Sequence, residues 1–165
     1  MDKPTFFAIM GAFPTGVTVV TALDAQGEPR GLTSNAFSSV SADPPLLLVC
    51  VDRRSNTLEA LQTTRKFVVN FLREGRGALS DRFASKVPDK FDGVAWRPAA
   101  NGQPLLYADV LSWAECSVEA EIPAGDHIVF IGRVEAGQPP APDSQPLMYF
   151  RRGYGSWPRP EENPS

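Results

Sequence analysis

The sequence has few of the residues that metal centres and hydrolytic sites require. Its 165 residues include one histidine, His127, and two cysteines, Cys50 and Cys116, with no HExxH or CxxC motif. Structural zinc sites use clusters of cysteine and histidine, and acyl-transfer triads need a histidine beside a nucleophile. These absences exclude a structural zinc site and predict that no metal is bound. They also leave no recognisable nucleophile triad.

The two cysteines are too far apart in sequence and too apolar in context for a redox motif. Cys50 and Cys116 each lie within an apolar, strand-like run. Buried free thiols in a reducing cytoplasm are the favoured interpretation, and a disulfide between them is the alternative.

The sequence also lacks a long apolar run and an excess of basic charge. No segment reaches the roughly 18 apolar residues that a membrane-spanning helix needs, and the first residues do not form a signal peptide. The net charge is -3 and the pI is near 5.2, so nucleic acid and anionic membranes are not expected partners. We expect a soluble cytoplasmic protein that binds small molecules or other proteins.

No GxGxxG motif follows a strand, and the sequence predicts too few helices for a doubly wound α/β sheet. Several strands at hairpin spacing instead predict a mainly β fold with short helices, closed into an antiparallel barrel. A chain of this length can bury roughly 70% of its unfolded surface in one core. We expect a single domain over residues 1–155 and a disordered tail over 156–165.

Apolar periodicity and turn residues predict the individual elements. A helix over about 4–12 carries the apolar side chains Phe6, Phe7, Ile9, Met10 and Phe13, and it is expected to pack against the sheet. Ser55 or Asn56 is expected to cap a second helix, with Glu59 completing a capping box. A third helix is expected around 78–85. The expected strands are 16–23, its hairpin partner 30–41, a strand buried on both faces over 46–51, and 67–72, 108–122, 127–136 and 146–151.

Small polar side chains crowd the strand over 32–41. They have two interpretations: an exposed strand with ordinary β-compatible residues, or a polar strip in a buried sheet that lies along a flat polar ligand. The second is favoured by the wholly apolar neighbouring strand, since buried hydroxyls and amides need partners. The residues concerned are Thr33, Ser34, Asn35, Ser38, Ser39 and Ser41.

The sequence DRRSNT follows the apolar strand and begins the second helix. Guanidinium groups, hydroxyls and free backbone N–H groups within a few residues suit a phosphate. The alternative is a solvated arginine pair beside an ordinary helix cap. The residues alone do not decide between these, nor which of Arg53 and Arg54 faces a ligand.

Four segments in this order resemble the flavin reductase family of small NAD(P)H-dependent enzymes. They are GLTSNAFSSVSADPPLLLVCVDRRSNTLEAL, FVVNFL, GDHIVFIGRVE and PLMYFRRGY, and the resemblance covers about residues 6–154. Within that family, the sequence is similar to the reductase components that supply reduced flavin to two-component aromatic monooxygenases. The resemblance implies an antiparallel split β-barrel, a homodimer whose partner subunit completes part of the site, FMN or FAD as the flavin, and NADH or NADPH as the electron donor.

The resemblance also implies roles for particular residues. The flavin ring and ribityl chain would lie along Thr33, Ser34, Asn35, Ala36, Ser39, Val40, Ser41, Cys50, Val51 and Asp52. Phosphate would be held by Arg53, Ser55 and Thr57. Further cofactor contacts would come from Asn70, Phe71, Lys90, Phe91 and Tyr154. His127, in the sequence Gly-Asp-His, would be the catalytic residue that faces the flavin where the nicotinamide stacks.

The implied activity is hydride transfer from NAD(P)H to flavin, with a monooxygenase as the recipient of reduced flavin. Three rivals are a non-catalytic flavin-binding protein of the same fold, an oxidase of the pyridoxamine-phosphate kind, and a purely structural dimer module. The oxidase needs another basic cluster, for which Arg151 and Arg152 are the only spare pair. A structural module leaves the polar strand unexplained.

Overall fold

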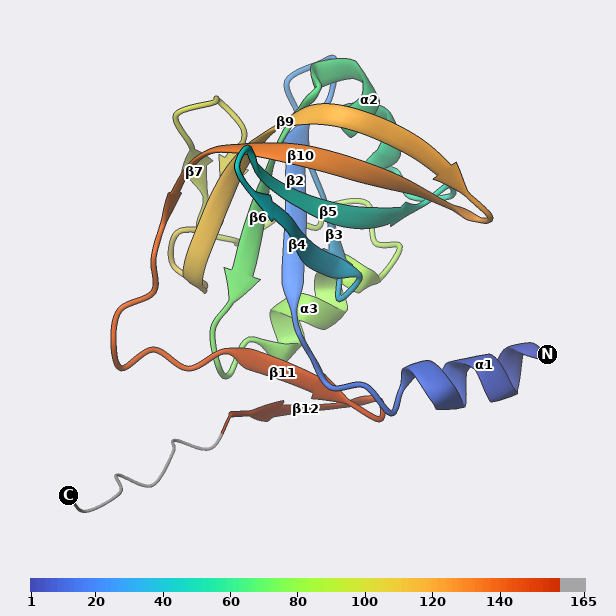
Figure 1. Ribbon diagram of the computed structural model, residues 1–165. Coiled ribbons are helices and arrows are strands. Elements are labelled where there is room, and N and C mark those ends of the chain that lie inside the picture. Colours follow the sequence, from blue (N-terminus) through green and yellow to red (C-terminus); the bar gives the residue numbers. More distant parts are fainter. Residues whose placement is uncertain (158–165) are drawn as a thin grey trace.

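The computed structural model describes residues 1–157 (Figure 1). Seven strands form one antiparallel sheet in the order β3-β2-β6-β9-β10-β5-β4. β-branched and aromatic residues make up more than half of β2 and β6, which suits strands at the centre of a sheet. Their bounds are β2 Thr18–Leu23, β3 Pro29–Ser34, β4 Phe37–Ala42, β5 Pro45–Asp52, β6 Lys66–Leu72, β9 Val110–Ala124 and β10 His127–Gln138.

The sheet curls until its two edges meet. Its edge strands, β3 and β4, are consecutive in sequence and only Asn35 and Ala36 separate them. The amide of Cys50 on β5 donates to the carbonyl of Ala36, with a nitrogen–oxygen distance of 3.0 Å. The expected antiparallel barrel is therefore confirmed, and its closure places residues 35–36 beside β5.

Smaller elements surround the barrel (Figure 1). A three-stranded sheet joins β1 Thr15–Gly16, β11 Leu147–Phe150 and β12 Gly153–Ser156, and a two-stranded one joins β7 Arg97–Pro98 and β8 Pro104–Leu105. The helices are α1 Lys3–Met10, α2 Leu58–Thr64 and α3 Gly77–Ala84. Figure 1 shows α3 below the barrel near β11, and α1 projecting away from it.

The core divides into two apolar clusters. The larger fills the barrel between its sheet and α2 and includes Val49, Leu61, Phe67 and Phe130. The second lies around α3 and includes Phe83, Leu106 and Leu147. Cys116 is buried in the first cluster, and burial raises the pKa of its thiol to about 12. Both cysteines are free, as predicted.

Most of the expected strands are confirmed within a few residues, but the expected hairpin partner is wrong. The run 30–41 is two strands: β3 pairs with β2, whereas β4 pairs with β5. The chain crosses from one edge of the sheet to the other at Asn35 and Ala36, and no glycine or proline in the sequence marks this break.

The strand 46–51 was expected to be buried on both faces, and this is also wrong. In β5, Leu47, Val49 and Val51 are buried, while the alternate residues Leu48 and Cys50 are only partly buried. One face of β5 packs in the barrel core, and the other face is accessible from outside the core.

The first helix does not pack against the sheet as expected. Asp2 caps α1 by accepting the amide of Thr5 at 2.9 Å, but none of the helix residues is buried. Phe7 on this helix is 55% exposed and Phe13, just beyond it, is 73% exposed. Within the single chain, residues 1–157 cover the apolar side chains of this helix only in part.

The predicted cap of the second helix is also wrong. α2 begins at Leu58, so Thr57 occupies the N-cap position and makes no side-chain cap hydrogen bond. The Ser55 hydroxyl instead accepts the amide of Thr57 at 3.2 Å, within the loop before the helix. No capping box with Glu59 forms.

The predicted tail began at Ser156, which the structure places at the end of β12. Residues 158–165 of that prediction lie outside the described residues. Among residues 1–157, no helix is both long and apolar enough to cross a membrane.

Candidate functional site

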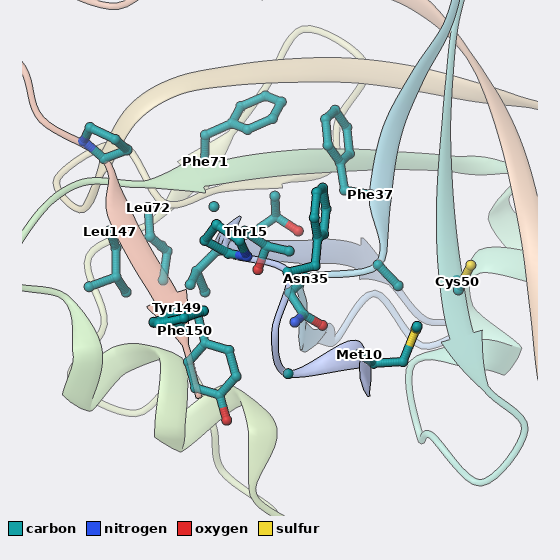
Figure 2. A pocket seen from close by; sticks show the side chains of 18 of the residues that line it. Met10, Thr15, Asn35, Phe37, Cys50, Phe71, Leu72, Leu147, Tyr149 and Phe150 are labelled. Atoms are coloured by element: carbon teal, nitrogen blue, oxygen red, sulfur yellow. The ribbon is translucent and has the colours of Figure 1, made fainter. Parts of the chain in front are cut away.

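A cavity of about 1270 Å³ lies where α1, β1 and β11 meet the barrel. Several aromatic side chains line its wall, including Phe37 and Phe71 from the barrel and Tyr149 and Phe150 from β11 (Figure 2). Phe37 and Phe71 make an edge-to-face pair with ring centroids 5.1 Å apart. A wall of this kind suits a flat, partly apolar ring system.

Four of the predicted cofactor residues line this cavity: Asn35, Ala36, Cys50 and Phe71. Residues 35 and 36 reach it because they bridge β3 and β4 at the corner of the barrel. Cys50 reaches it because side chains alternate along β5, which turns Leu48 and Cys50 toward the cavity. Burial raises the pKa of the Cys50 thiol, so this part of the wall is uncharged.

The same alternation turns Val51 into the barrel core, where it is fully buried. Its side chain does not line the cavity. Ser34 is also buried, and its hydroxyl lies between the Ala36 amide at 3.2 Å and the Cys50 carbonyl at 3.5 Å. Thr33 donates to the carbonyl of Ser80 on α3 at 2.6 Å. The Thr33 and Ser34 side chains therefore join elements of the fold.

Ser39, Val40 and Ser41 lie on β4, at the edge of the sheet and outside the cavity wall. The pairing of β4 with β5 shifts register between Ser39 and Ser41, which leaves Val40 without a partner residue. Such a bulge bends and twists an edge strand. Val40 is 48% exposed, so this segment of β4 presents an open surface.

The end of β5 is a compact polar turn. Asp52 accepts the backbone amide of Arg54 at 2.8 Å and pairs with both Nε and Nη2 of the same arginine, at 3.1 and 2.8 Å. The Arg54 side chain, followed by its backbone amide, lowers the pKa of the Asp52 carboxyl well below its usual range. Arg54 is thereby occupied by an acid within its own turn.

Arg53 is held differently from Arg54. Its Nε donates to the Gly125 carbonyl at 3.0 Å, and its amide donates to the Asp126 carbonyl at 3.0 Å. Within residues 1–157 its guanidinium has no acidic partner, so it keeps N–H groups for a ligand. Ser55 is part-exposed beside it and Thr57 is buried.

His127 lies next to this turn because β10 pairs with β5 in the register His127–Asp52. Its Nδ1 is 2.8 Å from the Asp126 carboxylate, which fixes the imidazole ring at the tip of the β9–β10 hairpin. The hydrogen bond with His127 lowers the pKa of Asp126. The structure thus gathers His127, Asp52 and Arg53 at one end of the sheet, next to the cavity wall at Cys50.

Asn70 lies away from the cavity. It is fully buried, and its Nδ2 donates to the Val19 carbonyl at 3.0 Å and the Thr21 hydroxyl at 2.9 Å. Its Oδ1 accepts the amide of Leu106 at 2.9 Å. The side chain makes these hydrogen bonds inside the protein, while the neighbouring Phe71 lines the cavity.

Lys90, Phe91 and Tyr154 gather around α3 and not in the cavity wall. Lys90 donates to the carbonyls of Gly31 at 3.2 Å and Phe83 at 2.8 Å, and burial lowers the pKa of its ammonium. Phe91 packs edge-on against Phe83, with centroids 5.0 Å apart. Tyr154 lies 2.9 Å from the Ser80 hydroxyl and 2.7 Å from Asp81. Burial raises the pKa of Tyr154.

Several cavity residues were not predicted as site residues. The apolar side chains of α1 were expected in the core but form one wall, and the C-terminal hairpin supplies another. In the sequence, this hairpin appeared in the segment PLMYFRRGY and as the spare pair Arg151 and Arg152, which among residues 1–157 are the only charged residues in the cavity wall. Thr15 also lies in the wall, and its buried hydroxyl has no hydrogen-bond partner among the described residues.

The sequence matches the family described as "Flavin reductase like domain" over residues 10–158. The chain belongs to this family. The flavin reductase (NADH) of Kitasatospora aureofaciens is 53% identical over 163 residues, which cover 98% of this chain and 85% of that protein. The reductase subunit of a flavin-dependent monooxygenase from Mycobacterium tuberculosis is 37% identical, with 93% and 82% covered.

The structure of this flavin reductase family member also resembles solved ones. An NADH:FAD oxidoreductase from Streptomyces globisporus C-1027, in complex with NAD and FAD fragments, superposes with a TM-score of 0.90. It is 32% identical, and the match covers 98% of this chain and 96% of that chain. The resemblance found in the four sequence segments is thereby confirmed at the level of the family and the fold.

Proposed function

We propose that this protein is an NAD(P)H:flavin oxidoreductase that reduces FMN or FAD and supplies the reduced flavin to a flavin-dependent monooxygenase. Family membership over residues 10–158 supports the activity, and the structure supports a place for the flavin. One observation carries the proposal. The cavity wall at Cys50 continues along β5 to the turn at Arg53, whose guanidinium suits a phosphate.

The residues fit a flavin. Asn35 lies in the cavity wall with no side-chain hydrogen bond within residues 1–157, and the buried Thr15 hydroxyl is similarly unpaired. Polar groups of this kind, in a wall that also carries Phe37 and Phe71, suit the polar edge of an aromatic ring (Figure 2). From Cys50 to Arg53 the chain advances about 10 Å, since a strand rises about 3.3 Å per residue. A ribityl chain and its phosphate can follow that path.

Each part of the site has a separate task. Asn35, Ala36 and Cys50 would position the ring, and Arg53 with Ser55 would hold the phosphate. The backbone amides of residues 53, 54, 55, 57 and 58 already donate within the protein, so the free N–H groups expected for this turn do not contribute. Of the two arginines, Arg53 is assigned to phosphate because Arg54 is already paired with Asp52. A bound flavin would supply the acceptor for a hydride from NADH or NADPH.

His127 would act by position. Asp126 holds its ring, and its side chain is 41% exposed, so the ring is accessible beside the Asp52 turn. From there it can contact a nicotinamide and exclude water from the ring above the flavin. A hydride transfer requires no proton donor at this residue, and correct placement of the two rings is the larger need.

We also propose a homodimer. The apolar side chains of Phe6, Phe7 and Phe13 form one wall of the cavity yet are about half or more exposed in the single chain. A second copy that covers this wall would remove apolar surface from water and close the cavity. A reducing, cytoplasmic setting is consistent with the two free thiols.

Steady-state oxidation of NADH and NADPH, each with added FMN and FAD, tests the activity directly. Flavin-dependent loss of pyridine-nucleotide absorbance is expected for at least one of the four pairs, and the preferred pair defines the donor and the flavin. A yellow protein with no turnover for any pair would instead indicate a flavin carrier. The variant His127→Ala is expected to slow turnover, whereas Arg97→Gln, an exposed arginine outside the cavity wall, is the matched control.

A further inference from the structure

The turn between β11 and β12 has an unusual backbone. Phe150 pairs with Gly153, so Arg151 and Arg152 alone form a two-residue hairpin loop. Their φ angles are +48° and +65°, in the left-handed region. Loops of this geometry favour Asn-Gly, because in the left-handed region the Cβ atom is crowded by a carbonyl oxygen; glycine has no Cβ, and asparagine offsets the cost with local side-chain hydrogen bonds. The glycine in this segment is Gly153, which lies outside the two loop positions that have positive φ angles.

This turn is held against the cavity. The amide of Arg151 donates to the Gly11 carbonyl at 3.2 Å, which ties the turn to the end of α1. The guanidinium of Arg151 lies 5.0 Å from the centre of the Phe150 ring, and Phe150 itself lines the cavity. The backbone tie to Gly11 could be made by any residue with an N–H group. It therefore does not explain two arginines.

The charge at this turn is entirely positive. Among residues 1–157, Arg151 and Arg152 are the only charged residues in the cavity wall, and no acidic residue lines it. Within residues 1–157, neither guanidinium forms a salt bridge or a side-chain hydrogen bond. Two unpaired guanidinium groups at the rim of an otherwise uncharged cavity attract an anion. An unfavourable backbone kept at such a rim points to a role in binding.

We propose that Arg151 and Arg152 bind the diphosphate group of a dinucleotide at the rim of the cavity. This inference rests on the proposed function and adds a second anion site to it, separate from the turn at Arg53. The chemistry is shared by two ligands of a flavin reductase, since NAD(P)H and FAD each contain a diphosphate and FMN does not. We assign the site to NAD(P)H, because the flavin's own phosphate already has the Arg53 turn.

The double variant Arg151→Asn, Arg152→Gly tests the proposal without disturbing the turn. It places the preferred residues of this loop type in the loop and removes both positive charges. The KM for NADH or NADPH, measured with FMN as acceptor, is expected to rise about tenfold or more, the usual effect of losing charge-assisted hydrogen bonds. The melting temperature is expected to stay the same or rise by a few degrees (about 2–4 °C). Arg97→Gln should change neither quantity.

Dissociation constants of FMN and FAD, measured by quenching of flavin fluorescence, separate the two sources of diphosphate. A raised KM for the pyridine nucleotide with unchanged FMN and FAD binding supports the assignment to NAD(P)H. Weakened FAD binding with unchanged FMN binding supports the diphosphate site with FAD as its ligand. Unchanged values throughout would overturn the proposal, and so would equal weakening of FMN and FAD with a lowered melting temperature.

The proposed function and this inference fail in different ways. If the unaltered protein oxidises neither NADH nor NADPH, the proposed activity fails, whereas the binding of FAD relative to FMN still tests the arginine site. If the unaltered protein is active and the double variant has the same constants, only the arginine site fails.

Discussion

Replacing Asn70 by alanine separates structural support from flavin binding. The resemblance placed this residue beside the flavin, whereas the structure buries it completely. From β6, its amide joins β2 and the segment after β8 through the Val19 carbonyl, the Thr21 hydroxyl and the Leu106 amide. The substitution removes all three hydrogen bonds at once.

The expected loss of stability follows from those bonds. Each buried hydrogen bond contributes about 1 kcal/mol to the free energy of unfolding, so Asn70→Ala should cost about 3 kcal/mol. The Leu106 amide would also be left buried without its acceptor, which makes this a lower bound. For a domain of this size, about 3 kcal/mol lowers the melting temperature by about 6–12 °C.

The assay pairs thermal unfolding at fixed protein concentration with flavin titration below the melting temperature. Asn35→Ala is the matched comparison, because Asn35 lies in the cavity wall and makes no side-chain hydrogen bond in the described part of the chain. Asn70→Ala should have a lowered melting temperature and an unchanged flavin affinity while it is folded. Asn35→Ala should have an unchanged melting temperature and a weakened flavin affinity. An Asn70→Ala protein with an unchanged melting temperature and tenfold weaker flavin binding would refute the reasoning.

Three further predictions concern the β5 turn and the barrel core. Arg53→Gln should weaken FMN binding about tenfold, while Arg54→Gln, whose arginine is already paired with Asp52, should change it much less; fluorescence titration compares the two. The pKa of Asp52 is depressed in the folded protein, so the ionised carboxylate stabilises the fold. This stabilisation is complete above the usual aspartate pKa range, and it is lost as the pH falls through that range and below it. Asp52→Asn should therefore reduce the acid sensitivity of unfolding, and equal pH dependence in both proteins would contradict this. Gly132→Ala would place its new Cβ atom 2.5 Å from Cζ of Phe67. The free energy of unfolding, measured with urea, should therefore fall by about 1–3 kcal/mol. An unchanged urea midpoint would show that the Phe67 ring can move aside.

The sequence predicted the parts of the fold that depend on local pattern. Alternating β-branched residues and turn residues placed most strands, and the lack of helices between strands predicted an antiparallel barrel. The crossing at Asn35 and Ala36 was not predictable, because it depends on which edge each strand joins and both halves of the run have similar residues. The outward position of α1 was missed because an apolar helix face indicates burial without indicating what covers it.

The site was predictable to a similar degree. The Arg53 turn could be recognised from its residue types, but its preference for Arg53 over Arg54 depends on a carboxylate geometry that no spacing reveals. Asn70 and Cys50 are both single polar or thiol residues within apolar strands. Strand alternation turns Cys50 to the cavity, whereas Asn70 is held inside by an amide from a loop 36 residues later.

The projecting helix α1 has a consequence for how this protein must be measured. An isolated helix of eight residues is too short to be stable in water, so its order depends on whatever covers its apolar side. If a second copy provides that cover, dilution will unravel α1 and remove one wall of the cavity. Helix content, flavin affinity and melting temperature would then fall together as the protein is diluted, by mass action alone. Constants obtained at nanomolar and micromolar protein would describe two different sites.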